Sequence, residues 1–174
     1  YNKNVVKKEL YGDKFKNHFI IDSVNANSSR KRFDLTIKAF NLFYEYNKQS
    51  LLVIKTTKPD NNPVACSFLN LLKFTPYHDN IIIIIDYLSY DSLNKLYSSF
   101  DIIINTTDGE GFGLIPFEAS LSGTLSIIPY HTSYKALIPK NMDFIVKKYS
   151  LIPYEYTRNT DDILNLLNGN IIKY

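Results

Sequence analysis

The stretch Asp101–Leu121, DIIINTTDGEGFGLIPFEASL, joins a buried run, a glycine-rich polar segment and a helical pattern. The β-branched run Asp101–Asn105 predicts a buried strand. Thr106–Phe112 is polar and contains glycine, so it predicts a loop, and the apolar spacing of Leu114–Leu121 predicts a helix that Gly123 ends. A loop of this kind between a buried strand and a helix is typical of a ligand-binding turn in α/β proteins.

The same alternation of strand and helix runs through most of the chain. Further strands are predicted at Phe19–Val24, Leu51–Lys55, Ile81–Ile85 and Leu125–Ile128, and further helices at Phe33–Asn47, Ala65–Leu72 and Ser89–Ser99. Strands that alternate with helices predict right-handed crossovers, and hence a Rossmann-like α/β fold with a parallel sheet and helices on both faces. The unbroken isoleucine run is typical of a strand covered on both faces, so Ile81–Ile85 is expected at the centre of the sheet. A last strand at Asp143–Val146 and a helix at Asp161–Leu167 are also expected.

Composition and charge restrict the class of protein. The 174 residues fit one domain, with 45% hydrophobic and 21% charged residues. A net charge of +3 with scattered basic residues does not favour a nucleic-acid partner. The longest apolar run, Ile81–Ile85, is far shorter than the roughly 20 residues of a membrane span, so no transmembrane segment is expected. The single cysteine, Cys66, excludes an internal disulfide and favours a reducing, cytoplasmic location, with membrane contact through another part of the protein left open.

The glycine-rich loop also indicates the chemistry of its ligand. Glycines allow close approach of the backbone, and the N–H groups at a helix start favour a phosphate. The carboxylates Glu110 and Glu118 suit hydroxyl groups instead. A nucleotide sugar carries both kinds of group, and Lys31, after the first predicted strand, adds a positive charge for its diphosphate.

These residues resemble a known family. Glu110 to Leu114, EGFGL, followed by Glu118 and Gly123, resembles the E-x7-E signature of retaining glycosyltransferases of the GT-B architecture, group 1 or family 4-like. The upstream positions that strengthen the resemblance are Lys31, Asp34, Ile37, Ala39, Phe40, Ser92, Leu93, Leu96, Tyr97 and Asp101. The resemblance covers about residues 19–128. It implies that residues 1–174 are a single nucleotide-sugar-binding domain, which corresponds to the C-terminal half of a GT-B enzyme. The N-terminal acceptor domain of such an enzyme is absent. The chain starts at Tyr1 and not at a methionine, which agrees with a fragment.

The resemblance assigns a role to each matched position. It implies that Glu110 is the catalytic contact to the transferred sugar and that Glu118 binds the ribose hydroxyls. By position, Tyr87 and Leu88 line the nucleobase pocket. Sugar and phosphate are held by the backbone of Gly111, Phe112, Gly113 and Leu114.

The diphosphate site departs from the family pattern. Lys31 matches the family's phosphate-binding lysine, but Asn25 and Ala26 stand where the family has Gly-Arg. Arg30 is therefore expected to supply the second cation, with reduced donor affinity as the alternative.

The predicted function is transfer of a sugar, with retention, from a UDP- or GDP-sugar to an unknown glycan, lipid or protein acceptor. The enzyme is hexosyltransferase-like, and the isolated domain is expected to be inactive. No metal or other cofactor is expected, and His18, His78 and His131 lack ligand spacing. The alternatives are a non-catalytic nucleotide-binding or scaffold domain of the same fold, and a nucleotide-sugar epimerase, against which the E-x7-E pattern argues.

Overall fold

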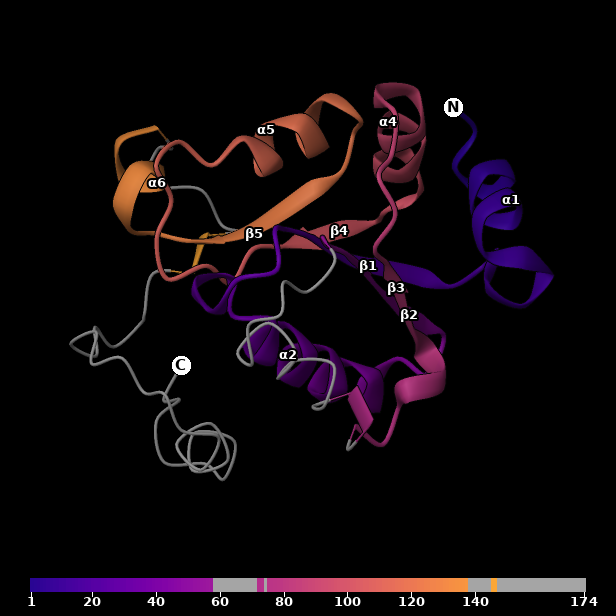
Figure 1. Cartoon of the computed structure of the whole chain (residues 1–174). Helices are drawn as coiled ribbons and strands as arrows, with labels where there is room; N and C mark the ends of the chain where they lie inside the picture. Colours follow the sequence, from indigo (N-terminus) through magenta and orange to yellow (C-terminus); the bar gives the residue numbers. More distant parts are fainter. Residues whose placement is uncertain (58–71, 74, 138–144, 147–174) are drawn as a thin grey trace.

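The computed structural model describes residues 1–57, 72–73, 75–137 and 145–146, and within them it is a parallel sheet covered by helices on both faces (Figure 1). The strands are β1 (Phe19–Val24), β2 (Ser50–Lys55), β3 (Ile81–Ile84), β4 (Ile102–Ile104), β5 (Leu125–Pro129) and β6 (Ile145–Val146). The helices are α1 (Lys3–Phe15), α2 (Phe33–Tyr46), α4 (Tyr90–Ser99), α5 (Leu114–Leu121) and α6 (Thr132–Leu137), with short 3-10 turns η1 (Ser29–Lys31) and η2 (His78–Asn80).

The strand order is β3-β2-β1-β4-β5-β6, and every neighbouring pair is parallel. The order reverses between β1 and β4, which pair at Ile21↔Ile102 and Asp22↔Ile103. In sheets of this kind the loops that leave two such strands diverge to opposite faces and open a crevice at their C-terminal ends. The loops that follow β1 and β4 are the two that the sequence marks for ligand binding.

Residues of opposite parity on each strand build the two apolar layers. On one face Phe33, Ile37 and Phe40 of α2 pack against Ile21, Leu52 and Ile54. On the other face Tyr11 of α1, Leu96 of α4 and Ala119 of α5 pack against Ile20, Val53 and Ile103. The α/β Rossmann-like fold predicted from the alternation is confirmed, and the predicted strands and helices between residues 19 and 57 and between 81 and 128 match the observed ones to within about a residue.

The predicted position of the isoleucine strand is wrong. β3 lies at one edge of the sheet that the described residues form, and its four residues are only partly buried. Ile82 and Ile84 still pack against one apolar layer, and Ile81 and Ile83 against the other. An apolar run therefore predicts that both faces of a strand are covered, as they are here. It does not predict whether the strand lies at the centre or at the edge of the sheet.

The N-terminal helix α1 is an element that the sequence patterns did not predict. It begins at the N-cap Asn2, whose side chain accepts from the N–H of Val5, and it packs against α4. Lys7 joins it to the sheet, because its Nζ donates to Asp101 Oδ2 at 2.6 Å and to the His18 carbonyl at 2.8 Å. Because Lys7 is buried beside the apolar layer, its charge needs a partner, and the ion pair with Asp101 supplies it.

Some of the predicted elements lie outside the described residues. The predicted helix Ala65–Leu72, apart from Leu72, the helix Asp161–Leu167 and Cys66 lie outside the described residues. Of the predicted strand Asp143–Val146, the structure describes Ile145–Val146 as β6, which pairs with β5.

Candidate functional site

The loops that follow β1 and β4 are joined by a set of hydrogen bonds. The N–H of Asp108 donates to the Arg30 carbonyl at 2.8 Å. The Thr106 hydroxyl lies 3.0 Å from the Lys31 carbonyl and 2.8 Å from the Arg32 carbonyl. Segments about 75 residues apart in the chain thus form one unit at the C-terminal edge of the sheet.

The side chains of Lys31, Arg30 and Glu110 meet on this unit. Lys31 Nζ donates to Glu110 Oε1, and both side chains are about nine-tenths buried. Arg30 Nη1 lies 3.6 Å from Glu110 Oε2 and donates to the Gly109 carbonyl. Glu110 is thus paired with the two cations that the sequence assigns to a diphosphate.

Arg32, the third residue of the basic cluster, has a structural role. It donates to Asp34 Oδ2 at 2.9 Å and to Asp108 Oδ1 at 3.2 Å, from a left-handed backbone with φ 51°. Burial disfavours its charge, but the two carboxylates together raise the pKa of Arg32. Burial raises the pKa of Asp108, and Arg32 offsets part of that rise. Of the three basic residues, only Arg30 and Lys31 therefore reach Glu110.

The start of α5 is fixed by Gly113, which another residue could replace only if the Tyr134 ring moved. Gly113, the N-cap of α5, has φ 80°, and a Cβ added to it would lie 2.3 Å from the ring of Tyr134. Tyr134 is fully buried, and its hydroxyl accepts from Asn105 Nδ2 at 2.8 Å. The first N–H groups of a helix have no partner inside the helix, so this cap aims donors at the crevice. Phe112 and Leu114 beside it are more than half exposed, which suits contact through the backbone.

Glu118 lies one helical turn after Ile115, on the same face of α5. Its Oε2 accepts from the Tyr97 hydroxyl at 2.8 Å. Burial and the neighbouring Glu118 raise the pKa of Tyr97, so the phenol stays a proton donor and holds the carboxylate in place.

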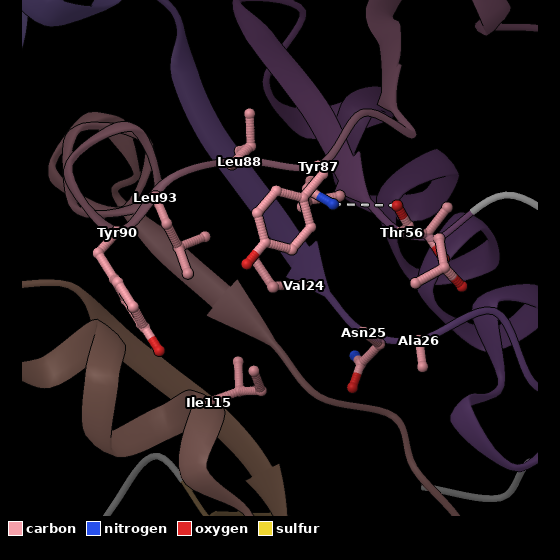
Figure 2. Close-up of a pocket in the computed structure, with 11 residues that line it drawn as sticks. Val24, Asn25, Ala26, Thr56, Tyr87, Leu88, Tyr90, Leu93 and Ile115 are labelled. Atoms are coloured by element: carbon pink, nitrogen blue, oxygen red, sulfur yellow. Dashed lines mark hydrogen bonds between the residues drawn. The ribbon is translucent and has the colours of Figure 1, made fainter.

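A cavity of about 340 Å³ opens at the C-terminal ends of β1 and β2, beside the first turn of α5 (Figure 2). Its lining is mostly apolar: Val24, Asn25, Ala26, Lys55, Thr56, Thr57, Tyr87, Leu88, Tyr90, Leu93 and Ile115. Tyr87 and Leu88, which the sequence assigns to a base pocket, both contribute to it.

Two buried polar atoms in the cavity wall lack a hydrogen-bond partner among the described residues. They are Asn25 Oδ1 and Thr56 Oγ1, on residues that are 6% and 1% exposed. An unpaired buried polar atom is unfavourable. Both atoms have almost no accessible surface, so a ligand in the cavity would pair with them after a small movement of the side chains. Sequence reasoning did not assign Thr56 a role; the available signal was its place directly after a buried strand, the same as that of Asn25.

Other site classes find less support. No group of three or more His, Cys, Asp or Glu side chains that could hold a metal is present in the described ranges. The absence of a metal from the reaction stays a prediction. The helices of the described part are all too short or too polar to cross a membrane.

Comparison with solved structures places the fold. The chain aligns with the C-terminal domain of the glycosyl transferase group 1 family protein LpcC from Francisella tularensis, with a TM-score of 0.69 and 16% identity, over 96% of this chain and 80% of that domain. It aligns with WaaG, a glycosyltransferase of lipopolysaccharide biosynthesis, with a TM-score of 0.63 and 19% identity, over 79% of this chain and 35% of that one. A UDP-forming α,α-trehalose-phosphate synthase from Burkholderia xenovorans gives a TM-score of 0.63 and 12% identity, over 83% and 39%.

These likenesses confirm the fold of a GT-B C-terminal domain. The chain spans most of the isolated LpcC domain but less than two-fifths of the two longer enzymes. No family model matches the sequence, and no curated protein matches it.

Proposed function

We propose that this chain is the donor-binding domain of a retaining glycosyltransferase, which binds a nucleoside diphosphate sugar and transfers its sugar to an acceptor held by another part of the protein. One observation carries the proposal. An apolar cavity with unpaired polar atoms and the Lys31–Arg30–Glu110 cluster lie along the same edge of the sheet, both at the end of β1. A cavity for a base next to two cations for a diphosphate is the arrangement that a nucleotide requires.

The proposed ligand pose follows from chemistry. The base enters the cavity, where Tyr87 and Leu88 supply apolar contact and Asn25 and Thr56 supply polar partners. The ribose hydroxyls meet Glu118. The diphosphate replaces Glu110 as the partner of Lys31 and Arg30, and the freed carboxylate turns to the hydroxyls of the sugar.

The proposed reaction breaks the bond between the anomeric carbon and the phosphate oxygen and forms a bond from that carbon to the acceptor oxygen on the same face of the sugar. The proton of the acceptor hydroxyl passes to the departing diphosphate. Negative charge then builds on the departing diphosphate. Lys31, Arg30 and the N–H groups at the start of α5 stabilise that charge, which lowers the barrier without requiring a metal. Because the acceptor half lies outside this chain, the isolated domain binds donor but does not transfer it. The resemblance to known glycosyltransferases supports this assignment, as does the UDP-forming activity in the name of one structural neighbour.

The second candidate is a nucleotide-binding domain without catalysis. Ala26 lines the cavity and carries no charge, where the resembling family has an arginine. With one fixed cation fewer, the site would hold a nucleotide but stabilise the leaving group poorly. Turnover of a nucleotide sugar by the full-length protein distinguishes the two.

The test is calorimetric titration of this domain with UDP, GDP, UDP-glucose and GDP-mannose. We expect one nucleotide to bind with a Kd in the micromolar to millimolar range, and Lys31→Gln to weaken it about tenfold, a loss of about 1.4 kcal/mol. Lys48→Gln is the matched control, because Lys48 pairs with Glu45 on the exposed surface of α2. Thermal unfolding of each variant confirms that it is folded. A folded domain and a full-length protein that both bind no nucleotide would contradict the proposal.

A further inference from the structure

Thr132, the first residue of α6 after β5, packs against the glycine-rich loop. The Thr132 hydroxyl accepts the backbone N–H of Glu110 at 3.1 Å. A Cβ placed on Gly109 would lie 3.5 Å from Thr132 Cγ2, so the Thr132 side chain lies directly beside the glycine-rich loop. Thr132 therefore holds the residue whose side chain pairs with Lys31.

The backbone of Thr132 is in an unfavourable conformation. Its φ is 48°, in the left-handed region that β-branched residues avoid. Arg32 is the other non-glycine residue with positive φ in the described part of the chain, and its carbonyl is bonded to Thr106. Both outliers thus form hydrogen bonds with the same loop. Strained residues persist where the surrounding contacts over-determine them, and they gather at functional sites.

We infer that Thr132 is a positioning residue, whose hydroxyl fixes the backbone of Glu110 and so aims its carboxylate into the cation pair. The strain is tolerated because a threonine in this conformation brings its Oγ1 onto the N–H of Glu110. What Glu110 does to a sugar rests on the proposed function, but the Thr132 contact does not.

The alternative is that the turn between β5 and α6 merely needs a left-handed residue and that the hydroxyl contact is incidental. The two accounts differ for glycine. Under both, Thr132→Gly relieves the backbone strain, but it also removes the hydroxyl and adds backbone freedom to the unfolded chain. Only if Thr132 positions Glu110 does the variant also lose the order of the site.

The first measurement is amide hydrogen exchange of Glu110 by NMR, on the domain without ligand. We expect exchange at least about tenfold faster in Thr132→Val, which lacks the acceptor but keeps the shape, and wild-type exchange in Thr132→Ser, which keeps the hydroxyl. Wild-type exchange in Thr132→Val would overturn the inference, whether or not any nucleotide binds.

The second measurement is hydrolysis of UDP-glucose or GDP-mannose by the full-length protein. We expect Thr132→Gly and Thr132→Val to lower kcat about 10- to 100-fold with KM for the donor little changed, and Thr132→Ser to retain activity. Full turnover by Thr132→Gly would show that the contact has no positioning role. Failure of every variant and of the wild type to bind nucleotide would instead contradict the proposed function, and the exchange result would still decide the role of Thr132.

Discussion

The residue with the most consequence in this site is Glu110, because it is held by the groups that a diphosphate needs. Its carboxylate is paired with Lys31 and lies 3.6 Å from Arg30. Under the proposed function a nucleotide displaces it, so the ion pair competes with the ligand for both cations.

Glu110→Gln should therefore tighten binding of free UDP or GDP, by about tenfold, because the neutral amide releases the cations to the phosphates. The same variant should lose turnover of the nucleotide sugar. Calorimetry with the nucleotide and a hydrolysis assay of the full-length protein measure the two effects. Glu45→Gln, which breaks an exposed pair with Lys48, is the control. Unchanged or weaker nucleotide binding in Glu110→Gln would refute the competition.

At the scale of elements, the cap of α5 depends on the fit between Gly113 and Tyr134. Gly113→Ala forces a Cβ into the buried ring from a left-handed backbone, and we expect a loss of about 3 kcal/mol or more. Gly123 is the matched position, with φ 76° and no atom within 4 Å of an added Cβ. Gly123→Ala should cost only the backbone strain, about 1–2 kcal/mol. Urea unfolding of both variants measures the difference, and equal losses would mean that the ring yields.

The packing of α1 against the rest of the domain can be tested by comparing two neighbouring lysines. Lys7 is 6% exposed at its side chain and pairs with Asp101, whereas Lys8, the next residue, pairs with Asp13 at the surface. Lys7→Ala leaves Asp101 without its main partner, and we expect a loss of about 3 kcal/mol. Lys8→Ala should cost less than about 1 kcal/mol. Chemical denaturation checks both, and a Lys7→Ala domain as stable as the Lys8→Ala domain would show that α1 does not depend on this pair.

At the scale of the whole molecule, the buried Asp22 makes stability depend on pH. Its side chain is fully buried on β1, and neither carboxylate oxygen has a hydrogen-bond partner in the described residues. Burial raises the pKa of Asp22 well above its usual value near 4. In the unfolded chain the same carboxyl ionises near pH 4, so the folded state loses stability as the pH rises from there toward the folded-state pKa.

Asp22→Asn removes this loss and keeps the shape of the side chain. We expect the free energy of unfolding of the variant, relative to wild type, to increase as the pH rises from about 4.5 to about 7.5. Any constant cost of the amide cancels in that comparison. The exposed Asp79→Asn should show no such trend. A difference that is flat with pH would mean that Asp22 is ionised in the folded domain.

Local sequence determined most of the elements of this fold, though not α1, and the place of its glycine-rich loop. Period-2 and period-3.6 apolar patterns reflect burial on one side of a strand or helix, and glycine is selected directly where the backbone must turn left-handed, as at Gly113 and Gly123. These are properties of short segments. The pattern was therefore sufficient for the Rossmann-like alternation and for the loop that carries Glu110.

Only the tertiary structure decided which residues meet. β3 lies at an edge although its sequence resembles that of a central strand, because covering both faces does not depend on strand order. The sheet brings the ends of β1, β4 and β5 together. Glu110 therefore pairs with Lys31, more than 70 residues away in the chain. Thr132 and Tyr134, about 20 residues away, contact the glycine-rich loop for the same reason. No local pattern encodes such contacts, since each residue type fits many environments until the fold selects its neighbours.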